Sequence, residues 1–177
     1  SCPFIFLIFH VRFFACFSIA IGTVLGLAFS KNLFTLFIFY EILTLSTFPL
    51  VAHKGTVEAL SGAKTYLKIL LGTSVGLQLI AIVSVYIFAG TLDFTSQGIL
   101  AGKITNFQAS VLLALFAFGI GKAALMPFHK WLPAAMVAPT PVSALLHAVA
   151  VVKAGVFTIL KVGVYIFGID FLKETGS

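Results

Sequence analysis

Four ionisable side chains stand inside long apolar runs of this 177-residue sequence: Glu41, Lys122, His147 and Lys153. A charged residue at the centre of a membrane-spanning helix costs about 2.5 to 3.5 kcal/mol on insertion scales, so such residues usually pair, face a wet cavity or serve an ion pathway. Burial disfavours the charged form of a lysine, whereas a nearby carboxylate favours it. A glutamate and a lysine whose contact can change would therefore form a proton switch.

Lys122 has the strongest local context of the four. A long apolar run precedes it, and Pro127 and His129 follow it closely. Because proline removes a backbone donor and crowds the preceding turn, we expect the helix to be broken here. A broken helix at membrane depth exposes carbonyl groups and half-helix ends that can solvate a cation or a proton carrier. A proline alone would favour a kink that only helps packing, but the neighbouring lysine and histidine favour a functional break.

The two remaining positions, His147 and Lys153, lie on one predicted helix. Their spacing places them about 240° apart around an ideal helix, so they share no face unless long side chains or a bulge bring both to one cavity. His147 alone is equally compatible with a hydrogen bond to a neighbouring carbonyl. Lysines nearer the helix ends, such as Lys64 and Lys161, are compatible with snorkelling to the surface. We expect Trp131 at the membrane interface, where tryptophan is common.

The composition indicates that the chain is solvated by lipid. It is 60% hydrophobic and 9% charged, with a mean hydropathy of +1.16, which is too apolar for a soluble domain of this length. The net charge of +6 comes from scattered lysines, which excludes a nucleic-acid interface. Cys2 and Cys16 provide neither a metal site nor a disulfide framework, and no nucleotide-binding loop or catalytic triad occurs. We therefore expect no cofactor and no metal.

Apolar runs of about 20 residues, the length that crosses a bilayer, position these residues. They predict an all-α integral membrane protein, one transmembrane domain over residues 1–177, with a bundle of about five helices. The expected spans are 4–29, 33–52, 62–89, 109–138, broken near Pro127, and 142–167. Because the chain starts at Ser1 without a signal-peptide pattern, we interpret it as a fragment of a longer protein.

Two stretches resemble a known family, the antiporter-like membrane subunits. The first is KAALMPFHKWLPAAMVAPTPVSALLHAVAVVKAG, from Lys122 to Gly155, and the second is YEILTLSTFPLV, from Tyr40 to Val51. Such subunits occur in Mrp-type monovalent cation/proton antiporters, in respiratory complex I and in membrane-bound hydrogenases. The resemblance covers about residues 33–172, whereas the first thirty residues match poorly.

The resemblance implies a fold of two inverted five-helix repeats, of which this chain would hold the first. It implies that Glu41 pairs with Lys122 and that protons pass on through positions His147 and Lys153. It also implies other membrane subunits as partners, protons and monovalent cations as substrates, and a bacterial cytoplasmic membrane as the location.

Three functions remain open at this point. The leading hypothesis is a proton-translocating subunit of a monovalent cation (Na⁺)/proton antiporter, which the lysine of VVKAG, Lys153, favours. The alternative is a proton-pumping subunit of a complex I-type NADH:quinone oxidoreductase or of a membrane-bound hydrogenase, with all redox chemistry in partner subunits. The third is a non-conducting membrane scaffold, which has no need for four costly central ionisable groups.

Overall fold

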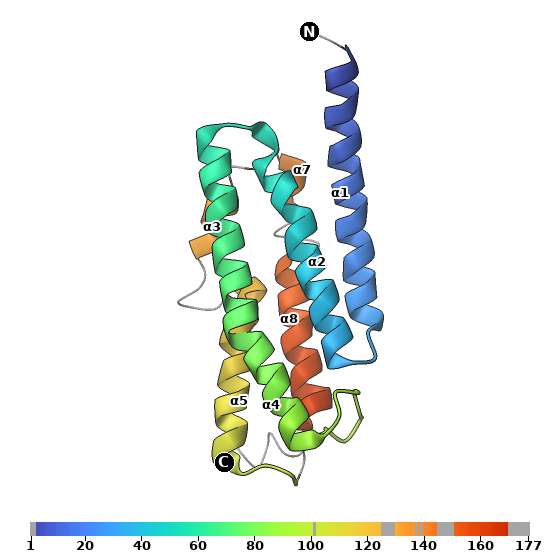
Figure 1. Cartoon of the computed structure of the whole chain (residues 1–177), viewed down its shortest axis with the longest axis vertical. Helices are drawn as coiled ribbons and strands as arrows, with labels where there is room; N and C mark the ends of the chain where they lie inside the picture. The colour runs from blue at the N-terminus through green and yellow to red at the C-terminus, as the bar shows by residue number, and fades with distance from the viewer. Residues whose placement is uncertain are drawn as a thin grey trace.

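The computed structural model describes residues 3–100, 102–124, 130–136, 138, 140–144 and 151–169 as helices joined by loops (Figure 1). Within these ranges an isolated bridge between Asn32 and Asp93 is the only β-type pairing. The all-α fold class is therefore confirmed. The elements are α1 (Pro3–Phe29), α2 (Leu33–Val51), a 3₁₀ turn (Ala52–Lys54), α3 (Val57–Thr73), a π-helical turn (Ser74–Gln78), α4 (Leu79–Ala89), α5 (Asn106–Gly119), a 3₁₀ turn (Gly121–Ala123), α6 (Trp131–Ala135), α7 (Thr140–Ala144), α8 (Val151–Val162) and a second π-helical turn (Gly163–Phe167).

Polar residues determine where the long helices begin. The side chains of Asn32 and Thr56 accept hydrogen bonds from backbone amides in the first turns of α2 and α3. Thr105 and Gln108 form a reciprocal capping box at the start of α5. Because Thr56 caps α3, this helix begins at Val57, before the Gly62 that we predicted as its start.

Three of the described helices are long and apolar enough to cross a membrane: Val11–Phe29, Leu33–Lys54 and Val57–Ala89. The last of these passes through the π-helical turn between α3 and α4 without ending. The shorter apolar helix α5 runs beside them (Figure 1). The chain is an integral membrane protein, as its composition predicts.

The fourth predicted span is broken, and the break begins well before Pro127. Helix α5 ends at Gly119, because Ile120 leaves the helical region with φ −82° and ψ 65°. After one 3₁₀ turn, Ala124 adopts the left-handed conformation with φ 54°. A proline disrupts the turn that directly precedes it, and Gly119 lies beyond that reach. Pro127 itself lies outside the described residues, and α5 ends where Gly119 packs closely against the backbone of Gln78.

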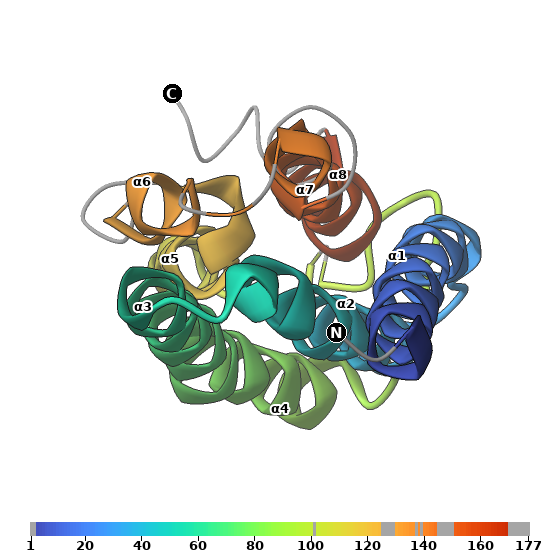
Figure 2. The ribbon, with the colours of Figure 1, turned by 90° about the horizontal axis from the view of Figure 1, so that it is seen from above.

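Helix α2 occupies the centre of the bundle. Seen from above, it lies between α1 on one side and α3 on the other, with α8 and α4 flanking it (Figure 2). Helix α1 packs along α2, α6 packs against α3, and α8 packs against the 3₁₀ turn of the break. A polar residue on α2 can therefore reach the broken segment directly.

Glycines allow the broken segment to be packed closely on both sides. A Cβ atom at Gly155 of α8 would collide with the backbone of Lys122 and Ala123. A Cβ at Gly119 would collide with the backbone of Gln78, and one at Gly121 with the hydroxyl of Thr73. The break is thus wedged between α8 and the junction of α3 with its π-helical turn.

Lys161 ties α8 to the end of α1. Its Nζ donates hydrogen bonds to the carbonyl oxygens of Ala28 (3.0 Å) and Ser30 (2.6 Å). A cation at a helix C-terminus is favourable because the last carbonyls lack helical donors. Lys161 is therefore a helix cap and not the freely snorkelling side chain that the sequence also allowed.

A methyl group at Gly155 should weaken the bundle. We expect Gly155→Ala in the intact subunit to lower the free energy of unfolding by about 1–3 kcal/mol, because the new Cβ displaces the backbone of the break. The measurement is the thermal unfolding midpoint in detergent. Gly72→Ala is the matched control, since a Cβ there meets nothing within 4 Å. Equal midpoints for the two variants would contradict the close packing of α8 on the break.

Candidate functional site

The amine of Lys122 is buried in the middle of the bundle and solvated by one turn of α2. The Lys122 side chain is completely inaccessible to solvent. Its Nζ donates to the carbonyl oxygen of Tyr40 at 2.8 Å and to the hydroxyl of Thr44, and it lies 3.2 Å from the centre of the Tyr40 ring. The contact with the ring is a cation–π interaction. The partners of this amine among the described residues are uncharged.

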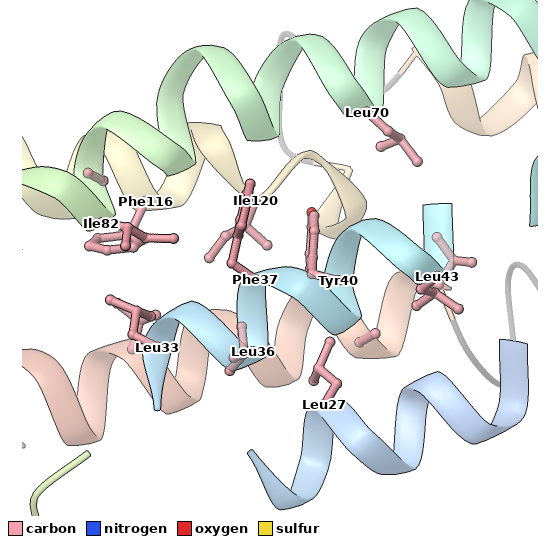
Figure 3. Close-up of a cluster of buried hydrophobic side chains, with 14 of the residues drawn as sticks. Leu27, Leu33, Leu36, Phe37, Tyr40, Leu43, Leu70, Ile82, Phe116 and Ile120 are labelled. Carbon is pink, nitrogen blue, oxygen red and sulfur yellow. The ribbon is translucent and has the colours of Figure 1, made fainter. Parts of the chain in front are cut away.

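The backbone of Lys122 is held by the same turn of α2. Its N–H, which has no helical acceptor in the break, donates to the Tyr40 hydroxyl at 3.1 Å. Figure 3 shows Tyr40 extending from α2 towards the segment that contains Ile120. A buried backbone donor without an acceptor is costly. The Tyr40 hydroxyl accepts the hydrogen bond from the backbone N–H of Lys122, and the Tyr40 carbonyl solvates the Lys122 amine.

Trp131 closes the opposite side of the break, and our expectation that it lies at the membrane interface was wrong. The side chain is fully buried, and its indole N–H donates to the carbonyl of Gly121 at 2.9 Å. Its ring packs edge-on against Tyr66, whose hydroxyl is 2.6 Å from that of Thr47. The indole thus provides a donor for a carbonyl group of the broken segment.

Glu41 lies close to Lys122 without touching it. Both carboxylate oxygens are buried and have no hydrogen-bond partner, and no ion pair joins them to Lys122 in the described ranges. Lys122 bonds to Tyr40 and Thr44, which precede and follow Glu41 on α2. A link between carboxylate and amine through water stays a prediction.

Of the other two predicted residues, the structure describes only Lys153, which forms no hydrogen bond with Lys122 within the described ranges. His147 lies outside the described residues, as do Pro127 and His129. Lys153 is exposed on α8, whereas its neighbours Ala154 and Gly155 are buried. No group of three His, Cys, Asp or Glu side chains that could hold a metal ion occurs in the part of the chain that the structure describes.

Two residues that bond to Lys122, Tyr40 and Thr44, were not predicted from the sequence, and neither was Gln78, which lies outside this site. Gln78 lies in the π-helical turn, is completely buried, and has no partner for its amide oxygen or nitrogen. Its signal in the sequence is a long polar side chain within the apolar run of α3 and α4. That signal is visible only when uncharged polar residues are searched as well as charged ones.

Residues 30–173 match the family described as "NADH:quinone oxidoreductase/Mrp antiporter, TM". The chain belongs to this family. It is 35% identical over 161 residues to NAD(P)H-quinone oxidoreductase chain 5 of Picosynechococcus sp., covering 86% of this chain and 24% of the relative. It is also 35% identical over 153 residues to a probable K⁺/H⁺ antiporter subunit of Rhizobium meliloti, covering 85% of this chain and 15% of that relative. The chain thus spans a quarter or less of these relatives.

Solved structures of membrane complexes share its fold. A chain of the Mrp complex from Dietzia sp. superimposes with a TM-score of 0.80 at 28% identity, covering 93% of this chain and 18% of that chain. A chain of the membrane-bound sulfane sulfur reductase, an archaeal respiratory membrane complex, gives a TM-score of 0.77 at 28% identity, covering 90% and 33%. Both confirm the family resemblance seen in the sequence.

Removing the Tyr40 hydroxyl should loosen the break at one amide. In Tyr40→Phe we expect the backbone N–H of Lys122 to exchange with deuterium about tenfold faster, because it loses its acceptor. Mass spectrometry of the intact subunit in detergent or nanodiscs would measure this exchange. Tyr86→Phe, at an exposed position of α4, is the control. Unchanged exchange in Tyr40→Phe would show that the hydroxyl does not hold the break.

Proposed function

We propose that this chain is the proton-translocating part of an antiporter-like membrane subunit, in which Lys122 binds and releases a proton under the influence of Glu41. One observation carries the proposal: a fully buried amine at a helix break, bonded to uncharged groups, with an unpartnered buried carboxylate close by. A stable structural ion pair would instead join the two charges directly. The separated pair leaves both groups able to exchange protons.

The contacts of Lys122 suggest how the site handles a proton. Lys122 donates hydrogen bonds to the Tyr40 carbonyl and the Thr44 hydroxyl. These two acceptors are within reach whether the side chain is an ammonium or a neutral amine. A proton that leaves the amine would reach Glu41 through water, because no direct bond joins them. A charged carboxylate stabilises the ammonium and a protonated one does not. The state of Glu41 would therefore decide whether Lys122 keeps its proton.

We propose that the route continues through His147 to Lys153, which lies on α8. Lys153 is exposed in this chain, which spans only part of its relatives. We propose that the rest of the protein covers this side of α8 and receives the proton there. His147 would connect Lys122 with Lys153, as the family resemblance implies.

For the whole protein we propose proton exchange coupled to Na⁺ or another monovalent cation, in a complex with other membrane subunits of the bacterial cytoplasmic membrane. The name of the Rhizobium relative and the fold shared with the Mrp complex support antiport. A second candidate, a proton-pumping subunit of a complex I-type oxidoreductase, is favoured by the name of the Picosynechococcus relative. Redox centres would then lie in partner subunits. Cation-dependent proton movement without a quinone substrate distinguishes antiport from the second candidate.

A non-conducting scaffold explains the site poorly. Buried charged or polar groups without partners destabilise a protein, and a scaffold would gain nothing from retaining them. Glu41 has two such oxygens in the described structure. The position of these groups beside a helix break therefore supports conduction.

Replacing Lys122 should stop proton movement while leaving assembly intact. In vesicles containing the complete complex, we expect Lys122→Ala to abolish cation-dependent proton flux, measured with a pH-sensitive dye after a sodium jump. Lys122→Arg should fail as well, because a guanidinium stays protonated near neutral pH. Lys64→Ala, which removes an exposed lysine of α3, is the control. Normal flux in assembled Lys122→Ala complexes would show that Lys122 is structural.

Neutralising Glu41 should slow the same flux. We expect Glu41→Gln, which keeps the shape of the side chain, to reduce the rate by about 10²-fold or more, the usual effect of losing a positioned acid or base. The variant should unfold at a midpoint equal to or above that of the wild type, because no buried hydrogen bond is lost. A wild-type rate would exclude Glu41 from the proton route.

A further inference from the structure

Two side chains in the described structure contain buried polar atoms without partners: Glu41, with both carboxylate oxygens, and Gln78, with its amide oxygen and nitrogen. Glu41 belongs to the site already described. Gln78 does not, although an amide group buried in a membrane protein normally finds a partner in the protein or in an ordered water. Because Gln78 is 0% exposed, lipid headgroups and bulk water cannot supply that partner.

The backbone around Gln78 is irregular at the depth of the helix break. Gln78 ends the π-helical turn, a feature that is rare and often occurs at functional sites. The neighbouring hydroxyls of Thr73 and Ser74 donate to carbonyls of the preceding turn, so they are already satisfied as donors. The amide of Gln78 is therefore the polar group that this turn leaves unbonded.

The π-helical turn lies directly against the end of α5. Gly119, the last residue of α5, approaches the backbone of Gln78 so closely that a Cβ could not be accommodated. An ordered water needs two to four polar partners. The Gln78 amide can provide two of them, an acceptor oxygen and a donor nitrogen. Lys122 follows in the next turn.

The side chain of Gln78 belongs to the inner face of the bundle. Ile82 lies four residues later, on the same face of the helix. Figure 3 shows Ile82 beside Phe116, on the side of its helix that faces α2 and Leu33. Gln78 is therefore on the face of the helix that packs into the bundle.

We propose that Gln78 holds a buried water at the end of α5 and that this water belongs to the hydrated route serving Lys122. Gln78 is then a positioning residue: its amide cannot accept a transported proton but orients the water that relays it. The second part of this inference, that the water belongs to the proton route, rests on the proposed function. The water site itself is independent of transport and can be tested separately.

The test compares Gln78→Met, Gln78→Asn and wild type in the complete complex. Methionine keeps the length of the side chain and removes both hydrogen-bonding atoms, whereas asparagine keeps the amide. The first readout is ordered-water density next to residue 78 in high-resolution cryo-electron microscopy maps. The second is the rate of proton flux in vesicles, and the third is the unfolding midpoint. Thr158→Val is the matched control, because this buried hydroxyl donates to the carbonyl of Ala154 in its own helix at 2.7 Å.

We expect water density in wild type and in Gln78→Asn but not in Gln78→Met. Flux should fall about tenfold in Gln78→Met and recover largely in Gln78→Asn, the factor that corresponds to one lost hydrogen bond. The midpoint of Gln78→Met should change little, because an apolar side chain of similar length replaces the amide and the water bonded to it together. Missing density in wild type overturns the water site. Water density in the wild type together with normal flux in Gln78→Met overturns the role of this water in the route. A loss of flux in Gln78→Met that is explained by a lowered unfolding midpoint overturns that role as well.

Failure of the proposed function gives a different pattern. If Lys122→Ala conducts normally while water density is present at Gln78, the site exists but the proton route through Lys122 is wrong. If Lys122→Ala is inactive and Gln78→Met conducts normally, the route stands and Gln78 is not part of it.

Discussion

The solvation of one buried ammonium group by a single turn of α2 is the constraint on which the rest of the structure depends. A lysine in the membrane interior needs oxygen atoms nearby, and Lys122 finds them in the Tyr40 carbonyl and the Thr44 hydroxyl. Such contact requires the fourth span to leave its helical path beside α2. The break leaves backbone groups without helical partners. Tyr40 accepts the hydrogen bond of the Lys122 N–H, and Trp131 donates one to the Gly121 carbonyl.

The break also determines the packing around it. A non-helical segment inside a bundle brings backbone against backbone, so side chains at the contact must be absent. Three glycines meet this requirement: Gly119 at the end of α5, Gly121 in the 3₁₀ turn and Gly155 on α8. The π-helical turn at Ser74–Gln78 lies where the segment presses against the long third helix. The polar site and the glycine contacts are therefore parts of one arrangement, and a change in either should affect the other.

Much of this could be predicted from the sequence, because lipid imposes simple rules. The apolar runs predicted the helices, and the isolation of Lys122 among apolar residues predicted that this lysine is buried. The start of the break could not be predicted from Pro127, since α5 already ends at Gly119, where it packs against Gln78. The burial of Trp131 was not predicted, and Gln78 was not recognised, because the burial of each depends on which helix lies opposite. Charge marks a site in sequence, whereas an uncharged amide such as Gln78 is recognised only from its surroundings.

The central claim is that the amine of Lys122 exchanges its proton under the control of Glu41. The most direct measurement is the ¹⁵N resonance of Lys122 Nζ in the selectively labelled, membrane-embedded protein, recorded as a function of pH. We predict that the signal moves between its ammonium and amine positions within the range in which the complex works, and that Glu41→Gln displaces this transition. A signal that stays at the ammonium position throughout, and that does not respond to Glu41→Gln, would contradict the account.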